Sequence, residues 1–243
     1  MTSSAAASAP IARAPLVYGH RGASADAPEN TLAAFALARQ QGADGVELDV
    51  RRSADGALVV HHDPALATGP VIARTPAADL PGWLPSLTAA LGELEGLVVN
   101  IEIKNSPFEP DHDPARTLAD DVVAVLEGRG NRDRVVVSSF DLATVDRVHD
   151  LAPSVPTGFL TFVHPVGAPA VALAAERGHV AIHPHEGTVD ADFVAHAHDA
   201  GLAVNVWTVD DPDRIRALAA AGVDGIITNV PGRAREVLRA ARG

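Results

Sequence analysis

Eight short runs rich in β-branched residues alternate with alanine-rich stretches of helical period, a pattern that predicts a (β/α)8 barrel of the α/β class. The runs are continuously apolar, as expected for parallel strands that are buried on both faces. The length of 243 residues also suits one barrel of this kind. We therefore expect a closed barrel and not an open sheet.

The predicted elements follow an N-terminal tail, residues 1–15, whose content of Ala, Ser and Pro indicates flexibility. We expect residues 16–243 to form a single domain. The eight predicted strands cover residues 16–19, 45–50, 98–104, 135–139, 157–161, 179–183, 202–208 and 225–229. Helical patterns lie between most of them, as parallel crossovers require, for example over residues 31–41, 118–127, 191–200 and 212–221. A left-handed glycine is expected to end the helix before several strands, at Gly42, Gly178, Gly201 and Gly222.

One further strand-like run, residues 57–62, lies too close to the second strand for a parallel crossover. Only residues 53–56 separate the two, so we predict an antiparallel hairpin with Asp55-Gly56 as a type I′ turn. In that register residue 49 faces residue 62. The hairpin is expected to project from the carboxyl end of the second strand, which is the catalytic end of such barrels.

The composition excludes several classes of partner. With 19 Lys and Arg against 31 Asp and Glu, the net charge of -12 makes nucleic acid and anionic membrane surfaces poor partners. The absence of cysteine excludes disulfides and thiolate metal sites. The sequence contains no uninterrupted run of about 18 apolar residues, so we predict no membrane span. The first residues lack the pattern of a secretory signal. We expect a cytoplasmic protein that acts on a small molecule.

Carboxylates lie on the predicted inner face of two neighbouring strands. The period of two places Glu47 and Asp49 on one face of the second strand, and it places Glu102 and Lys104 together on the third. Three carboxylates inside a barrel are costly unless they are protonated, hydrogen-bonded or neutralised by a cation. An all-oxygen set suits Ca²⁺ or Mg²⁺ better than zinc. The alternative is a network of salt bridges with Arg21, Lys104 and Arg51.

Two histidines belong to the same predicted end of the barrel. His20 directly follows the first strand, beside Arg21. In the predicted hairpin register His62 lies across from Asp49, whereas His61 points the other way. Two imidazoles beside three carboxylates indicate acid–base chemistry on a phosphate, and they favour the metal over the salt-bridge network.

Six short motifs that include these residues occur in a fixed order along the chain. They are Gly19-His-Arg-Gly22, Pro28-Glu-Asn-Thr31, Glu47-Leu-Asp49, Val59-Val-His-His-Asp-Pro64, Asn100-Ile-Glu-Ile-Lys104 and Val206-Trp-Thr-Val209. Together they resemble the glycerophosphodiester phosphodiesterase family, and the resemblance extends from residue 16 to about residue 231. One departure is Asn229, where many members of the family carry Asp.

The resemblance implies a TIM barrel of the phospholipase C-like phosphodiesterase type. It also implies hydrolysis of glycerophosphodiesters to sn-glycerol 3-phosphate and an alcohol. By this resemblance Glu47, Asp49 and Glu102 bind one divalent cation, Ca²⁺ or Mg²⁺. His20 and His62 are then the catalytic pair, and Arg21 and Lys104 contact the phosphate. We expect the neighbouring 2-hydroxyl of the glycerol to attack first and to form a cyclic phosphate, because it is already tethered to the phosphorus.

Four further assignments remain open in the sequence. Trp207 is expected either to form an apolar wall for the glycerol carbons or to pack in the core. Asn30, which precedes the first helical pattern, is expected to be its N-cap. Residues 105–114 form either a lid or an inert loop. The competing activities are a lysophospholipase D or sphingomyelinase D-like phosphodiesterase and a catalytically silent binding barrel. Long-chain substrates favour an apolar mouth, and the aromatic content of 4% argues against one.

Overall fold

The structure is a computed structural model that describes residues 14–67, 69–129, 134–162 and 165–241. Residues 1–13 of the predicted N-terminal tail lie outside the described residues. Within these ranges, no helix combines the length and the apolar character that crossing a membrane requires. The cytoplasmic location stays a prediction from the sequence.

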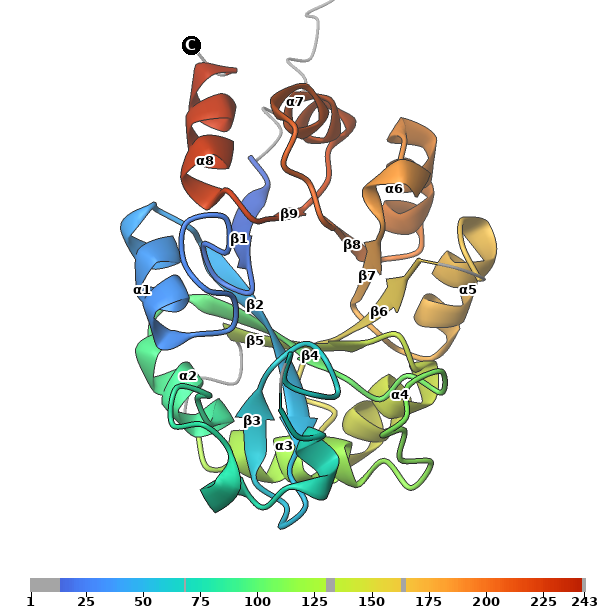
Figure 1. The fold of residues 1–243 in the computed structure, drawn as a ribbon. Coiled ribbons are helices and arrows are strands. Elements are labelled where there is room, and N and C mark those ends of the chain that lie inside the picture. Colours follow the sequence, from blue (N-terminus) through green and yellow to red (C-terminus); the bar gives the residue numbers. More distant parts are fainter. Residues whose placement is uncertain (1–13, 68, 130–133, 163–164, 242–243) are drawn as a thin grey trace, which may run out of the picture.

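Eight parallel strands of the described chain close into a barrel, which confirms the predicted fold (Figure 1). The strands are β1 (Leu16–His20), β2 (Gly45–Arg52), β4 (Val98–Ile103), β5 (Val135–Ser139), β6 (Thr157–Thr161), β7 (Ala181–Pro184), β8 (Ala203–Val206) and β9 (Gly225–Thr228). They follow one another around the sheet in the order β1-β9-β8-β7-β6-β5-β4-β2, and the pairing of β1 with β2 closes the ring.

Helices form a ring around the barrel (Figure 1). In the described ranges they are α1 (Leu32–Gln40), α2 (Leu87–Glu93), α3 (Thr117–Glu127), α4 (Leu142–Leu151), α5 (Ala168–Glu176), α6 (Ala191–Asp199), α7 (Pro212–Ala221) and α8 (Pro231–Ala240). Short 3₁₀ turns are η1 (Ile72–Arg74), η2 (Ala77–Asp79) and η4 (Glu186–Thr188). The glycines predicted to end helices all have positive φ, at Gly42, Gly178, Gly201 and Gly222.

The alternation along β2 separates the apolar core from the barrel interior. Val46, Leu48 and Val50 are fully buried in the core cluster that also contains Phe35 of α1. The residues between them, Glu47 and Asp49, are buried on the opposite face of the strand. A strand of this composition therefore supplies the core with one face and the candidate site with the other.

The predicted register of the hairpin was wrong by one residue. β3 (Leu58–Val60) pairs with β2 so that Val50 lies opposite Val60, and extending this pairing places residue 49 opposite residue 61. The reason is the turn: the Ser53 N–H donates to the Ala57 carbonyl at 2.9 Å and leaves a three-residue loop. A type I′ turn needs positive φ at both central residues. Only Gly56 has it, with φ of 89°, whereas Asp55 does not.

Candidate active site

Three carboxylates from β2 and β4 meet at the carboxyl end of the barrel. One oxygen each of Glu47, Asp49 and Glu102 lies within 4.8 Å of the others. Asp49 and Glu102 are direct neighbours in the parallel register of the two strands. All three side chains are buried. The backbone register thus brings together the carboxylates that the sequence placed on the inner face.

This cluster fits a divalent cation. Glu47 Oε1 and Asp49 Oδ1 are buried and have no hydrogen-bond partner among the described residues. Buried carboxylate oxygens are costly when left unpaired, and a hard cation takes such oxygens as ligands. The cluster therefore retains ligand atoms that no hydrogen bond satisfies.

The three carboxyl groups differ in their pKa. Burial, and then the charges of Asp49 and Glu102, raise the pKa of Glu47 well above its ordinary value. Burial raises the pKa of Glu102 as well, against the opposing charge of Lys104. Burial disfavours ionised Asp49 too, but Lys104 and Arg21 outweigh it and lower the pKa of Asp49. Without a cation, Glu47 is the carboxyl group that is most easily protonated.

Two cations flank the cluster. Lys104 Nζ donates to Glu102 Oε1 at 2.7 Å and lies 3.6 Å from Asp49 Oδ1. Arg21 Nε lies 3.3 Å from Asp49 Oδ2. The predicted network of salt bridges therefore forms in part around the cluster.

Arg51 does not join this network. Its guanidinium forms ion pairs with Glu109 and Asp111, each at 2.8 Å, and its Nε donates to the His62 carbonyl at 2.7 Å. Arg51 is fully buried, so these bonds tie the loop after β4 to the hairpin. The prediction that Arg51 could neutralise the carboxylates was wrong.

The turn after β1 orients Arg21 and His20. Arg21 has a left-handed backbone with φ of 56°, and its N–H donates to Glu47 Oε2 at 3.0 Å. Gly22 follows with φ of 88°, and a Cβ there would lie 2.7 Å from the Cβ of Ala34. Only glycine fits this close approach of the turn to α1.

His20 lies between an amide and the carboxylate cluster. Its Nδ1 is 2.7 Å from Asn229 Oδ1, and its Nε2 is 4.0 Å from Glu47 Oε2. Burial and the charge of Arg21 lower the pKa of His20, and the bond to Asn229 opposes this shift. The imidazole therefore directs Nε2 toward the carboxylates, while Nδ1 is bound to Asn229.

His62 lies within electrostatic range of the carboxylates, although the register that led to this expectation was wrong. Its charge is among those that lower the pKa of Asp49, and its Nδ1 lies 2.7 Å from Asp63 Oδ1. His61 instead contacts Trp83, with 6.2 Å between the ring centroids. β3 ends at Val60, so strict alternation no longer decides the direction of the next two side chains.

Trp207 borders the same site. It lines a small hollow together with His20, Glu47 and Glu102. Its Nε1 donates to the His183 carbonyl at 2.8 Å, and its ring contacts Phe140 with 5.4 Å between centroids. Trp207 is thus anchored by its indole N–H and has part of its surface turned toward the candidate site.

Two residues near the site were misassigned or missed in the sequence. Thr31 and not Asn30 caps α1, because the Thr31 side chain accepts from the Ala34 N–H. Asn30 is buried, with φ of 57°, and its Nδ2 donates to Asp49 Oδ2 at 2.8 Å. Asp210 was not predicted at all, yet its Oδ2 accepts from Asn229 Nδ2 at 2.6 Å. The first contact joins a loop residue to β2 and the second joins two loops, and only a Pro-Glu-Asn-Thr motif hinted at Asn30.

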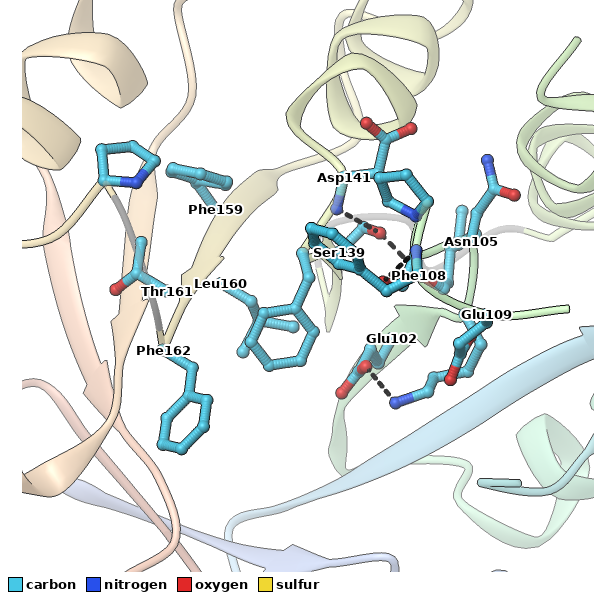
Figure 2. Close-up of a pocket in the computed structure, with 16 residues that line it drawn as sticks. Glu102, Asn105, Phe108, Glu109, Ser139, Asp141, Phe159, Leu160, Thr161 and Phe162 are labelled. Carbon is cyan, nitrogen blue, oxygen red and sulfur yellow. Dashed lines mark hydrogen bonds and ion pairs between the residues drawn. The ribbon is translucent and has the colours of Figure 1, made fainter. Parts of the chain in front are cut away.

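A pocket of about 450 Å³ opens beside the cluster, between the ends of β4, β5 and β6 and the loop after β4 (Figure 2). Glu102 and Lys104 belong to its wall and to the candidate site alike. Part of the predicted lid, residues 105–109, covers one side of this pocket. Asn105 holds this loop through bonds to the Asp113 carbonyl and to Thr144 Oγ1, both at 3.0 Å.

The fold and the site together define a (β/α)8-barrel enzyme with an acid- and histidine-bearing centre at the carboxyl end of its strands. Residues 20–233 match the model of the glycerophosphoryl diester phosphodiesterase family, and the chain belongs to this family of phosphoric diester hydrolases.

Individual relatives agree with this assignment. The chain is 31% identical to a glycerophosphodiester phosphodiesterase of Caldanaerobacter subterraneus, over 89% of this chain and 94% of the relative. It is 33% identical to the probable glycerophosphodiester phosphodiesterase 1 of Mycobacterium tuberculosis, over 96% and 95% of the two chains.

Solved structures show the same fold. A putative glycerophosphoryl diester phosphodiesterase from Silicibacter pomeroyi superposes with a TM-score of 0.84 at 28% identity, over 93% of this chain and 94% of that one. A phosphodiesterase from Oleispira antarctica, solved with the product sn-glycerol-3-phosphate, has a TM-score of 0.81 at 27% identity, over 93% and 97%.

Proposed function

We propose that the protein hydrolyses glycerophosphodiesters to sn-glycerol 3-phosphate and an alcohol with the help of one divalent cation, Ca²⁺ or Mg²⁺. The observation that carries this proposal is the cluster of three buried carboxylates, with His20 beside it and His62 within electrostatic range, at one end of the barrel. The product found in the related Oleispira antarctica structure supports the choice of substrate. In this proposal residues 16–243 act as one catalytic domain.

The phosphate is assigned to the cationic side chains beside the cluster. Arg21 and Lys104 both lie at the edge of the carboxylates and carry the charge that a phosphodiester requires. Glu47, Asp49 and Glu102 would hold the cation, which when bound supplies positive charge to a phosphate oxygen in the transition state. Trp207 forms an apolar wall for the glycerol carbons.

The two histidines divide the proton transfers between them. In the first step His62 takes the proton of the glycerol 2-hydroxyl, whose oxygen attacks the phosphorus. The bond from phosphorus to the alcohol oxygen breaks, and His20 Nε2 gives this oxygen a proton. In the second step His20 takes a proton from water as it attacks the cyclic phosphate. His62 then returns a proton to the 2-oxygen, which restores both residues.

Release of glycerol 3-phosphate from glycerophosphocholine tests the proposal. We expect release with Mg²⁺ or Ca²⁺, loss of release with a chelator, and loss in His20→Ala and Glu47→Gln. If a folded wild-type protein releases no product with any divalent cation, the silent binding barrel replaces this proposal. If Glu47→Gln retains wild-type turnover at saturating metal, the assignment of the metal ligands is wrong.

A further inference from the structure

The pocket beside the carboxylate cluster is continuous with the candidate site. Glu102 and Lys104 line both, so a substrate whose phosphate lies at Lys104 has one substituent directly at the pocket entrance. Figure 2 shows Glu102 on one wall and Phe159 and Phe162 on the opposite one, at the end of β6. A volume of about 450 Å³ lies within the range of small-molecule sites.

Apolar side chains make up half of the described residues that line this pocket. All six phenylalanines of the chain lie in the described residues, and four of them line the pocket: Phe108, Phe140, Phe159 and Phe162. Leu160 and Pro165 add to the same wall. The aromatic content of the chain is low, but it is concentrated at this one place. The low aromatic content of the whole chain therefore does not describe this pocket.

Two of these aromatic rings are exposed to solvent, where an apolar side chain gains no free energy from burial. Phe108 is 90% exposed and Phe162 is 55% exposed. Both lie at the mouth of a pocket whose deeper wall includes the buried Phe159. Exposed apolar groups that continue into an apolar pocket are typical of a binding site for an apolar ligand.

The polar groups of the wall are largely engaged within the protein. Ser139 Oγ donates to the Ile103 carbonyl at 2.7 Å, and Asp141 Oδ2 accepts from Thr144 Oγ1 at 2.7 Å. Glu109 is paired with Arg51. A strongly hydrated substituent would lose water on entering the pocket and regain few hydrogen bonds there. A hydrocarbon chain has no hydrogen bonds to water to lose, and its burial in the pocket is favourable in free energy.

We propose that this pocket binds a hydrocarbon chain carried by the diester, so that the enzyme prefers chain-bearing glycerophosphodiesters over short polar ones. This inference rests on the proposed function, because the pocket orients the chain only if the phosphate lies between Lys104 and the histidines. The chain can belong to the leaving alcohol or to the 1-position of the glycerol. In both cases the glycerol 2-hydroxyl stays free to attack.

A series of glycerophospho-n-alkanols tests the proposal, with ethanol, butanol, hexanol and octanol as alcohols and each substrate kept below its critical micelle concentration. Each fully buried methylene is worth up to about a fourfold change in kcat/KM. Because the mouth is partly open to solvent, we expect a rise of about tenfold or more from the two-carbon to the eight-carbon ester. A second arm compares kcat/KM for 1-octanoyl-lysophosphatidylcholine and for glycerophosphocholine. It tests whether a chain on the glycerol has the same effect as a chain on the alcohol.

A pair of variants links the effect to the pocket. Phe162→Ser, at a half-exposed ring, should flatten the dependence of kcat/KM on chain length in whichever arm shows it. Trp83→Ser removes a comparably exposed aromatic ring, 56% exposed, outside the pocket and should leave the dependence intact. A dependence that survives in Phe162→Ser overturns the assignment of the pocket.

The outcomes separate this inference from the function on which it rests. If glycerophosphoethanol and glycerophosphocholine are hydrolysed but neither arm shows a gain with chain length, the inference fails and the proposed function stands. If no diester in either arm is hydrolysed, both fail. A gain in one arm supports the inference and identifies the part of the substrate that carries the chain.

Discussion

His20 Nδ1 lies 2.7 Å from Asn229 Oδ1, and this contact determines which nitrogen of the imidazole is available to the site. Asn229 Nδ2 donates to Asp210 Oδ2 at 2.6 Å, and a carboxylate can only accept this bond, so Asn229 must turn its oxygen toward His20. Ser24 Oγ donates to the same oxygen at 2.8 Å. His20 therefore keeps a proton on Nδ1 throughout and exchanges the catalytic proton at Nε2, which lies toward the carboxylates.

Replacing Asn229 by Leu should lower kcat by about 10- to 100-fold with little change in KM, because proton transfer by Nε2 depends on the orientation of the ring. Steady-state kinetics with glycerophosphocholine measure both constants. Asn229→Asp alone should also be impaired, since it places two carboxylates in contact with each other.

An exchange of the two side chains distinguishes orientation from a loss of packing. Asn229→Asp combined with Asp210→Asn restores a donor and an acceptor and moves the charge next to His20. We expect the double variant to recover most of kcat and to shift the histidine limb of its pH profile upward, because a carboxylate raises the pKa of an adjacent imidazole. Equal damage in the single and double variants would exclude a positioning role.

Without the divalent cation, the contribution of Glu47 to stability should fall as pH rises. The pKa of Glu47 in the folded state lies well above its ordinary value of 4.5, so the folded state binds more protons than the unfolded state from about pH 4.5 upward. In that range each rise in pH costs stability until Glu47 is ionised. Glu47→Gln is neutral and should be more stable than the metal-free wild type at pH 8.

Thermal unfolding with and without metal measures this difference. For the wild type at about 100 times the Kd, we expect Mg²⁺ or Ca²⁺ to raise Tm by about 5–10 °C. The same addition should shift Glu47→Gln much less. Equal shifts in the two proteins would mean that the cation binds elsewhere.

The fold was predictable because its signals are local. Side chains alternate between the two faces of a strand, which separates Val46 and Leu48 from Glu47 and Asp49. A helix end such as Gly222 is recognisable because glycine readily adopts the left-handed conformation there. The hairpin register was not predictable in this way. It depends on how residues 54–56 close the turn, and a two-residue and a three-residue loop can use the same Asp-Gly pair.

Strand patterns predicted only the part of the candidate site that strands carry. The three carboxylates occupy strand positions, whereas Asn30 reaches Asp49 from a loop. The bond between His20 and Asn229 joins residues 209 positions apart, at the two ends of the barrel sequence. The aromatic pocket gathers side chains from the ends of three strands and the segments that follow them, so the overall aromatic content does not reveal it. These residues are far apart in the sequence and come together only in the closed barrel, so the sequence alone does not predict their contacts.

His62 and His61 form a matched pair for testing the acid–base assignment. Replacing His62 by Ala should lower kcat by about 10²–10⁴-fold, because it removes the proposed base of the first step. His61→Ala removes a ring that contacts Trp83 and should cost less than about tenfold in kcat. Steady-state kinetics on both variants, with circular dichroism to confirm folding, measure the contrast. If His61→Ala is the more damaging change, the two residues must exchange roles.

His183 should make the barrel sensitive to acid independently of catalysis. It is fully buried in β7, and burial lowers its pKa to about 4 from the ordinary 6.5. Its Nε2 lies 3.1 Å from Asn205 Nδ2 and accepts from that amide, which requires a neutral ring. The unfolded state therefore binds more protons than the folded state between pH 6.5 and about 4, and stability contributed by neutral His183 is lost as pH falls through this window.

The full effect corresponds to about 3 kcal/mol, from 1.36 kcal/mol per pKa unit. About 2 kcal/mol of it falls between pH 7.5 and pH 5.0. Urea unfolding at these two pH values in the wild type and in His183→Gln measures this part. The variant should be less stable at pH 7.5, because glutamine packs imperfectly beside Gly158, where the imidazole Nε2 fits closely. It should also lose less stability between the two pH values. An identical loss in both proteins would place the acid sensitivity in other groups.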